Sequence, residues 1–329
     1  MLDQVLDVFD VAPDFDLNLM QPGQSLSALT GRIVGALEAV LQPSHPDLVI
    51  VQGDTTTTLA GALAAFYQHI DVAHVEAGLR TGDMRQPFPE EMNRVLTSRI
   101  AAWHFAPTTR AREALLAEGV ADSRIVVTGN TGIDAVLFIR EKLNAGAIPS
   151  PSWPWLLPDR RLILVTSHRR ENFGPGFDRC MHALATLARR TDVQIAYPVH
   201  RNPNVLGPAH QLLSGNPNVV LLDPLPYAAF VDLMCRAYLI VTDSGGIQEE
   251  APSLGKPVLV LRDKTERPEA VDAGTVKLVG TDEERIVREA ALLLDDEAAY
   301  ARMTTVHNPY GDGRACRRIA EALCATANN

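Results

Sequence analysis

The sequence predicts an α/β fold with two parallel-sheet domains, and three observations lead to this prediction. Short apolar runs alternate with helical patterns along the whole chain, which is typical of βαβ units. The composition is 46% hydrophobic but only 5% aromatic, with many alanine, valine and leucine residues, as in proteins with buried parallel strands. A length of 329 residues suggests about two domains.

The first domain is predicted to span residues 1–152. Apolar runs at residues 47–51, 72–75, 101–105 and 125–128 predict its strands, and LAGALAAFYQ predicts a helix after the first of them. The stretch at 145–160 is rich in proline, glycine and serine, which indicates a linker between domains.

The alternation restarts after this linker, so the second domain is predicted at residues 153–310. Its strands are expected in RLILVTSH, VQIAYPVH, VVLLDPL, AYLIVTDS and PVLVLRD, and several of them end directly on polar or charged residues. Ligands of open α/β sheets gather beyond the carboxyl ends of the strands. Two such domains facing each other would form a deep cleft. The last segment, 311–329, predicts a closing helix.

Charge and cysteine content narrow the function classes. The formal net charge of −10 argues against nucleic acid or an anionic membrane as a partner, because no basic field would attract phosphate backbones. The sequence shows no signal peptide and no apolar run long enough to span a bilayer, so we expect a cytoplasmic protein. The four cysteines contain no C-x-x-C pair and indicate small buried hydrophobes in a reducing compartment: Cys180, Cys235, Cys316 and Cys324.

The segment TDSGGIQEEAPSLGKP, residues 242–257, predicts an anion-binding turn. A strand ends at Thr242, Ser244–Gly246 forms a tight turn, and a helix is expected to start near Ile247. The free N–H groups of that helix favour an anion such as phosphate. The alternative is an ordinary βα turn, since Glu249 and Glu250 are good helix starters by themselves. On the functional interpretation, one of these glutamates accepts hydrogen bonds from ribose hydroxyls.

Three acids follow predicted strands of the first domain. In GDTTTT, Asp54 is either a functional carboxylate or the N-cap of the next helix. In HVEAGLRTGD, Glu76 ends a strand, where an unpaired buried carboxylate is a poor structural choice. In PFPEEMNR, Pro89 begins a helix with Glu90 in its first turn, which is also a standard helix start.

Cations follow strands of the second domain. SHRRENFG places His168, Arg169 and Arg170 at one strand end, and ERPEA adds Arg267, as expected of an anion site. No His, Cys or Asp group has ligand-like spacing, so we predict no metal. This distribution predicts that the second domain holds a nucleotide diphosphate and presents its attached group to carboxylates of the first.

Several motifs together resemble the non-hydrolysing UDP-N-acetylglucosamine 2-epimerases of bacteria: GDTTTT, HVEAGLRTGD, PEEMNR, SHRRENFG, DSGGIQEEAP and ERPEA. The resemblance runs from about residue 1 to the C-terminus. It implies the two Rossmann-like domains of the GT-B fold, with the helix in 311–329 packed back on the first domain. It also implies reversible conversion of UDP-GlcNAc to UDP-ManNAc for cell-surface polysaccharide, without metal or other cofactor, by a homodimer.

The resemblance also assigns residues. The catalytic positions that it implies are Asp54, Glu76, Glu90 and His168. The UDP-binding positions that it implies are Arg169, Phe230, Ser244, Gly245, Gly246, Glu250 and Arg267.

This sequence departs from the family pattern at its start. Family members begin with a strand, a Gly-Thr-Arg-Pro-Glu loop and a helix, whereas this chain starts inside the next unit, at MLDQVLDVF. We therefore expect the first domain to lack its first βαβ unit, roughly 30 residues or more, together with an active-site Arg and Lys. Three alternatives stay open: a hydrolysing epimerase that releases ManNAc and UDP, a GT-B glycosyltransferase, and an inactive UDP-sugar binding fragment.

Overall fold

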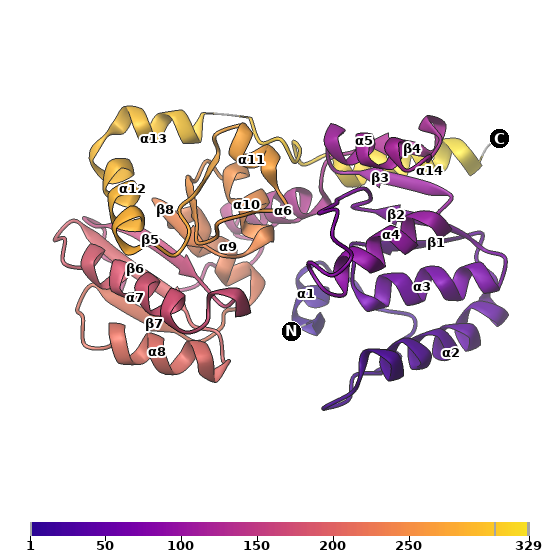
Figure 1. Ribbon diagram of the computed structural model, residues 1–329, viewed down its shortest axis with the longest axis horizontal. Coiled ribbons are helices and arrows are strands. Elements are labelled where there is room, and N and C mark those ends of the chain that lie inside the picture. Colours follow the sequence, from indigo (N-terminus) through magenta and orange to yellow (C-terminus); the bar gives the residue numbers. More distant parts are fainter. Residues whose placement is uncertain (1, 306, 328–329) are drawn as a thin grey trace. The chain divides into compact units, whose positions relative to one another are not determined.

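Two units, each built on one parallel sheet, make up the chain in the computed structural model, which describes residues 2–305 and 307–327 (Figure 1). The β1–β4 unit comprises Ala12–Thr131 and Tyr310–Asn329. The β5–β10 unit comprises Met1–Val11 and Gly132–Pro309. The predicted fold class, α/β with two parallel-sheet domains, is confirmed.

Strands and helices alternate in the β1–β4 unit, whose sheet is entirely parallel in the order β1-β2-β3-β4. Serine or threonine caps three of its helices, because Ser25, Thr55 and Thr108 accept hydrogen bonds from first-turn N–H groups. Its elements are α2 (Leu26–Ser44), β1 (Leu48–Gln52), α3 (Thr56–Tyr67), β2 (Asp71–Val75), α4 (Glu90–Ile100), β3 (Trp103–Ala106), α5 (Thr109–Ala117), η1 (Asp122–Arg124), β4 (Ile125–Val127) and α14 (Ala315–Ala327).

Alternation along β2 divides the core of this unit between the two faces of the sheet. Val72 packs with apolar residues of α2 and α3 on one face. Ala73 and Val75 point the other way and pack with Ile319 of α14. Strand β1 is less covered, and the side chain of Ile50 is 54% exposed.

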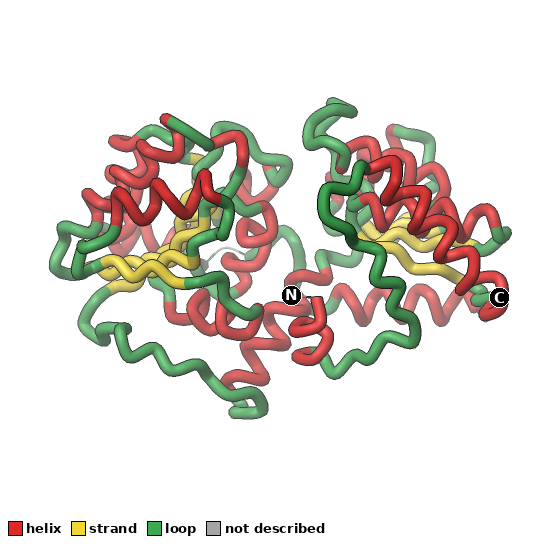
Figure 2. Tube along the Cα trace, turned by 90° about the horizontal axis from the view of Figure 1, so that it is seen from below, coloured by secondary structure: helices red, strands yellow, loops and turns green. Residues whose placement is uncertain are grey.

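The β5–β10 unit has the larger sheet, again entirely parallel, and helices lie on both sides of it (Figure 2). One apolar cluster joins β5, β6 and β8 to α7, α8 and α12. Its elements are α1 (Leu2–Val8), α6 (Thr131–Asn144), β5 (Arg161–Thr166), η2 (Arg170–Asn172), α7 (Pro175–Leu187), β6 (Val193–Pro198), α8 (Pro203–Leu213), β7 (Val219–Leu222), α9 (Tyr227–Arg236), β8 (Leu239–Thr242), α10 (Gly245–Ser253), β9 (Val258–Val260), α11 (Pro268–Asp272), β10 (Val276–Leu278), α12 (Glu283–Asp295) and α13 (Glu297–Thr304).

The strand order of this sheet, β10-β9-β8-β5-β6-β7, reverses direction between β5 and β8. The chain adds β6 and β7 on one side of β5, and then β8, β9 and β10 on the other. Helices that follow the two central strands therefore leave on opposite faces, which opens a crevice at their carboxyl ends. The motifs SHRRENFG and DSGGIQEEAP follow β5 and β8, so both lie at this switch point.

The predicted boundary after residue 152 differs from the observed division. Residues 1–11 and α6 group with the β5–β10 unit. The reason is apolar packing: Phe9 stacks on Phe138 of α6, with ring centroids 5.4 Å apart, and lies 6.4 Å from Tyr227 of α9. Sequence periodicity finds helices but does not show which sheet they pack on. The described residues contain no helix that is long and apolar enough to cross a membrane.

Candidate active site

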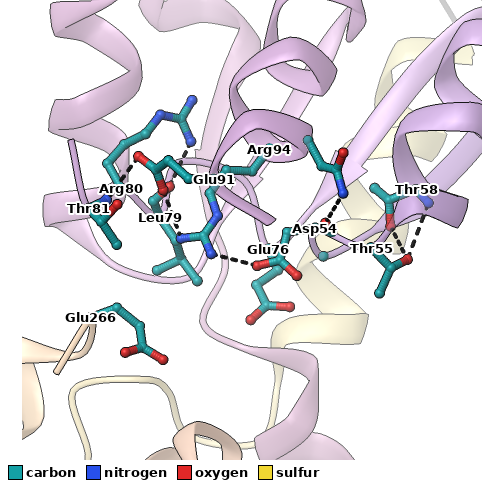
Figure 3. Close-up of polar contacts among 12 residues, drawn as sticks. Asp54, Thr55, Thr58, Glu76, Leu79, Arg80, Thr81, Glu91, Arg94 and Glu266 are labelled. Carbon is teal, nitrogen blue, oxygen red and sulfur yellow. Dashed lines mark hydrogen bonds and ion pairs between the residues drawn. The ribbon is translucent and has the colours of Figure 1, made fainter. Parts of the chain in front are cut away.

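Two carboxylates follow neighbouring strands of the β1–β4 unit. Gln52 and Val75 end β1 and β2 in register, so Asp54 and Glu76 leave the sheet at the same edge. Figure 3 shows both side chains at this edge. The Glu76 carboxylate lies against Gly53, where a Cβ would sit 3.4 Å from Glu76 Oε2. The two acids therefore lie on neighbouring loops at one edge of the sheet.

Asp54 is held by α4 and does not cap α3. The N-cap of α3 is Thr55, whose Oγ1 accepts from Thr58 N–H at 3.3 Å. The Asp54 carboxylate instead accepts from Arg94 Nη2 at 2.7 Å, and Asn93 Nδ2 donates to the Asp54 carbonyl at 2.9 Å. The Arg94 side chain is only 5% exposed, whereas the Asp54 side chain is 31% exposed, so a buried arginine orients a carboxylate that solvent still reaches. The N-cap interpretation of Asp54 is wrong.

Glu76 has a backbone conformation that L-residues rarely adopt. Its φ is +65°, and such strain is concentrated at functional sites, where the surrounding structure over-determines it. Asn130, which follows the end of β4, contacts Glu76 Oε1 through Nδ2 at 3.5 Å. The unfavourable backbone conformation at Glu76 therefore favours a functional role for its carboxylate.

The two adjacent glutamates of PEEMNR occupy different environments. Glu91 is buried, and its Oε1 accepts from the N–H groups of Thr81 and Gly82, each at 3.0 Å. Its Oε2 lies 3.4 Å from Arg94 Nη1. Glu90, the first residue of α4, is half-buried. Glu91 therefore fixes the loop before α4, and Glu90 is the more accessible acid.

In the β5–β10 unit, His168 follows β5 and faces the buried Asp243, which follows β8. His168 Nδ1 lies 3.5 Å from Asp243 Oδ1. Asp243 Oδ2 accepts from Ser167 Oγ at 3.0 Å and from the N–H groups of His168 and Arg169 at 2.8 and 2.9 Å. Burial lowers the pKa of His168, while the charge of Asp243 acts in the opposite direction. The hydrogen bonds fix the β5 loop, and they place the charge of Asp243 beside the imidazole.

A pocket of about 170 Å³ opens at the switch point of this unit. His168 and His200 stack on one of its sides, with ring centroids 5.5 Å apart. Ser244 and Ile247 at the start of α10 and Leu225 before α9 also line it. Phe230 lies one turn into α9 and is half-buried. The pocket thus joins an imidazole, a helix N-terminus and apolar side chains.

Helix α10 begins at Gly245, two residues before the predicted start. Ser244 is its N-cap but makes no side-chain capping hydrogen bond, so the first N–H groups are not capped by that side chain. Gly245 lets Arg267 approach the helix, because a Cβ there would displace the guanidinium of Arg267. Gly246 is exposed beside it. The glycines bring an arginine against the helix N-terminus, as an anion site needs.

Arg267 belongs to a group of charges around Glu266. It pairs with Glu249 and Glu266, and Arg262 Nη1 lies 2.8 Å from Glu266 Oε2. Arg169 lies 3.7 Å from the same carboxylate. Burial opposes ionisation of Glu266, but Arg267 and Arg262 lower its pKa to about 2. Glu266 thus stays ionised and pre-orients three arginines.

Glu250 differs from the other acids of this region. It is half-buried in the first turns of α10. Desolvation and the neighbouring Glu249 raise its pKa to about 8, and Arg267 only partly offsets them. A carboxyl group in this state can both donate and accept hydrogen bonds near neutral pH, which suits contact with a sugar hydroxyl.

Comparisons with known proteins agree with this geometry. The sequence pattern that describes the UDP-N-acetylglucosamine 2-epimerase family matches residues 1–324. The chain belongs to this family. A UDP-N-acetylglucosamine 2-epimerase of Escherichia coli K12 is 58% identical over 328 residues, which cover 98% of this chain and 87% of the relative.

Solved structures of UDP-GlcNAc 2-epimerases have the same fold. The Neisseria meningitidis enzyme, crystallised with UDP-GlcNAc, superposes with a TM-score of 0.93 at 48% identity, covering 98% of this chain and 88% of that one. The Staphylococcus aureus MnaA structure with UDP gives a TM-score of 0.92 at 43% identity, covering all of this chain and 87% of that one. The match includes both parallel-sheet units.

The structure adds residues that the sequence did not single out. Arg94 and Glu91 lie on the helix that PEEMNR predicts, but only the fold shows that they meet Asp54 and the loop before α4. Asp243 lies inside the DSGG motif and is completely buried. Its carboxylate accepts hydrogen bonds from the loop after β5, which explains why an acid precedes the turn. Asn130 has no sequence signal beyond following a strand. No group of three or more His, Cys, Asp or Glu side chains in the described ranges could hold a metal ion.

Proposed function

We propose that the chain catalyses reversible epimerisation at C2 of UDP-N-acetylglucosamine to UDP-N-acetylmannosamine. The observation that carries this proposal is the family match over residues 1–324. The anion-binding features at the β5/β8 switch point and the carboxylates after β1 and β2 suit the two halves of such a substrate. The relatives support epimerisation and do not favour the hydrolysing alternative.

The reaction requires UDP to leave before C2 can be inverted. The C2 proton is not acidic, because no carbonyl group is adjacent to it. Cleavage of the bond between C1 and the diphosphate oxygen creates oxocarbenium character at C1 and makes that proton removable. Loss of the proton gives a glycal and UDP. UDP then returns to C1 while a proton is delivered to the opposite face of C2.

These steps need a base and an acid on different faces of the sugar. Asp54, Glu76 and Glu90 are the groups to which we assign this work. Arg94 pairs with Asp54, and Asn130 contacts the Glu76 carboxylate.

The departing diphosphate needs positive charge that is already oriented when the bond breaks. We assign this role to the N–H groups of Gly245 and Gly246, to Arg267 and Arg169, and to His168. Arg267 and Arg169 are oriented by Glu266. Ser244 belongs to the same turn. We further assign ribose contact to Glu250 and contact with the base to Phe230.

The test is incubation with UDP-GlcNAc in deuterium oxide, followed by proton NMR. We expect UDP-ManNAc with deuterium at C2 and no free ManNAc. Free ManNAc would identify a hydrolysing enzyme. Binding of UDP in calorimetry without any turnover would leave a UDP-sugar binding protein.

Single variants then test the site. Glu76→Gln and Asp54→Asn should lower turnover by about 10²- to 10⁴-fold and leave the affinity for UDP unchanged, because the diphosphate contacts lie in the other unit. Asp71→Asn is the matched control. Asp71 is exposed at the opposite end of β2, so its loss should not affect turnover. Near-normal turnover in both active-site variants would overturn the assignment.

We also propose that the chain acts as a cytoplasmic homodimer and feeds cell-surface polysaccharide synthesis, as the family resemblance implies. Light scattering coupled to size-exclusion chromatography measures the mass directly. A mass of twice 35.8 kDa is expected, and a monomer would contradict the proposal.

A further inference from the structure

The loop that carries Asp54 is held at three successive carbonyl groups. Each carbonyl accepts a hydrogen bond from a buried side chain of a different element, α3, β2 or α4. The bonds are Thr58 Oγ1 to the Gln52 carbonyl at 2.6 Å, His74 Nε2 to the Gly53 carbonyl at 2.8 Å, and Asn93 Nδ2 to the Asp54 carbonyl at 2.9 Å. The exposed fractions of the three donor residues are 4%, 0% and 2%. We call residues 52–54 the Asp54 loop.

Burying three polar donors against one loop has a free-energy cost, which is justified if the position of the Asp54 loop is important. A carbonyl at the end of a strand can hydrogen-bond to water without any protein partner. Burying a polar side chain to bind it adds a desolvation cost that one neutral hydrogen bond offsets only in part. Three separate elements nevertheless supply such donors to consecutive carbonyls, and Arg94 holds the Asp54 carboxylate as well. Together they fix the main chain and the side chain of one residue.

His74 is the most informative of the three donors. A carbonyl oxygen only accepts, so Nε2 carries the proton. Its Nδ1 has no hydrogen-bond partner in the described part of the chain, so the contact with the Gly53 carbonyl is the hydrogen bond of this ring. Burial lowers the pKa of His74 to about 4, and the ring is therefore neutral at neutral pH.

We propose that His74, with Thr58 and Asn93, is a positioning residue that sets the place of the Asp54 carboxylate for the reaction. The inference rests on the proposed function, because it takes Asp54 to act on the substrate. None of the three donors needs to touch the substrate. They act through the backbone of the Asp54 loop.

Two isosteric substitutions separate positioning from simple packing. In His74→Gln, the amide Nε2 reaches the position of the imidazole Nε2 and can still donate to the Gly53 carbonyl. In His74→Asn, the amide nitrogen reaches only the position of Nδ1 and leaves that carbonyl unbonded. We expect His74→Asn to lower kcat by about 10²-fold, the cost of a displacement near 1 Å. UDP affinity should not change, and His74→Gln should recover most of the loss.

His104 provides the matched control. It is also buried in the same sheet, lies in register with His74 on β3, and contacts the Ser98 carbonyl through Nε2 at 3.0 Å. Its partner is Ser98 near the end of α4, whereas the Asp54 loop is bonded by Asn93 and Arg94 in the first half of that helix. His104→Asn should therefore lower thermal stability about as much as His74→Asn, while kcat stays near that of the parent chain.

Hydrogen exchange gives a readout that does not depend on activity. Amides that follow the Asp54 loop should exchange faster in His74→Asn than in His74→Gln or the parent chain. If the parent chain fails to epimerise, the proposed function fails, and this measurement still decides the positioning role. The positioning role is overturned by unchanged exchange in His74→Asn. It is also overturned if His74→Asn and His104→Asn lose kcat equally.

Discussion

At the start of α4, removing the charge of Glu91 should mainly lower stability, whereas removing the charge of Glu90 should mainly lower kcat. Glu91 is buried with a side chain 2% exposed, accepts two backbone N–H bonds and lies beside Arg94. Hydrogen bonds to a charged group are each worth about 1 kcal/mol more than neutral ones. Glu91→Gln keeps the shape but removes the charge, so it should lower the free energy of unfolding by about 2 kcal/mol for the two bonds. The weakened pairing with Arg94 should add to this, to a total of about 3 kcal/mol.

Glu90→Gln removes a charge of the same type from the same turn. Its loss costs only the favourable interaction with the helix N-terminus, about 0.3–1 kcal/mol. If Glu90 transfers a proton in the reaction, however, kcat should fall by about 10²-fold or more. Glu91→Gln should keep kcat closer to that of the parent chain, because Asp54 keeps its partner Arg94.

Urea unfolding followed by circular dichroism measures the free energy of unfolding. NMR of UDP-GlcNAc and UDP-ManNAc measures kcat. The pair of variants serves as its own control, since both change one carboxylate to an amide in the same helical turn. Unfolding of Glu91→Gln at the same urea concentration as Glu90→Gln would contradict the stabilising role of the Glu91 charge. A Glu90→Gln variant with unchanged kcat would remove Glu90 from the acid–base groups.

Three further predictions follow from other parts of the structure. Gly245→Ala should weaken UDP binding in calorimetry without unfolding the protein, because the new methyl group displaces the Arg267 guanidinium; unchanged affinity would show that this arginine does not contact UDP. Gly78→Ala should lower the free energy of unfolding by at least about 2 kcal/mol, since φ is +93° and the Cβ would overlap the carbonyl of Ala111; an unchanged urea midpoint would contradict the packing. The pKa of Glu250 is raised from 4.5 to about 8 in the folded protein. Between pH 4.5 and pH 8 the native state therefore binds more protons than the unfolded state. The contribution of Glu250 to the free energy of unfolding falls as pH rises through this window. Glu250→Gln should therefore gain stability relative to the parent chain from pH 5 to pH 8.5, and parallel pH profiles of the two proteins would count against the shift.

Sequence periodicity predicted most of the strands, because apolar runs mark them in the sequence. Residues 72–75 and 125–128 fall on strands within one residue at each end. Strand β10 was missed: Val276–Leu278 is only three residues long and lies at the edge of its sheet, where Lys277 is exposed. Strand β4 is equally short and also lies at an edge, but all three of its residues are apolar, whereas Lys277 interrupts the apolar run of β10. The grouping of residues 1–11 with the β5–β10 unit has a different cause, since the packing of Phe9 on Phe138 joins residues far apart in sequence.

The candidate site was predictable where a motif fixes the backbone. Strand, Ser-Gly-Gly turn and helix follow each other in sequence, so the anion-binding turn could be placed without a structure. Asp54 could not be interpreted in this way, because a cap and an ion-paired carboxylate have the same sequence signal. Two contacts in the structure distinguish the cap from the ion-paired carboxylate: Arg94 of α4 pairs with Asp54, and Thr55 caps α3.

One physical arrangement recurs in both units and explains why the predicted residues are only partly exposed. A functional group at a strand end is oriented by an oppositely charged or hydrogen-bonding partner that is itself buried: Arg94 for Asp54, and Asp243 for His168. Because Asp243 Oδ2 is occupied by three strong donors, Oδ1 is the oxygen that faces Nδ1 of the imidazole. The charge of Asp243 opposes the fall in the pKa of His168 that burial causes, so it favours the protonated ring that a departing diphosphate needs. The buried partners thus act on the position or the charge of the exposed groups, and this explains why such costly charges are kept in the interior.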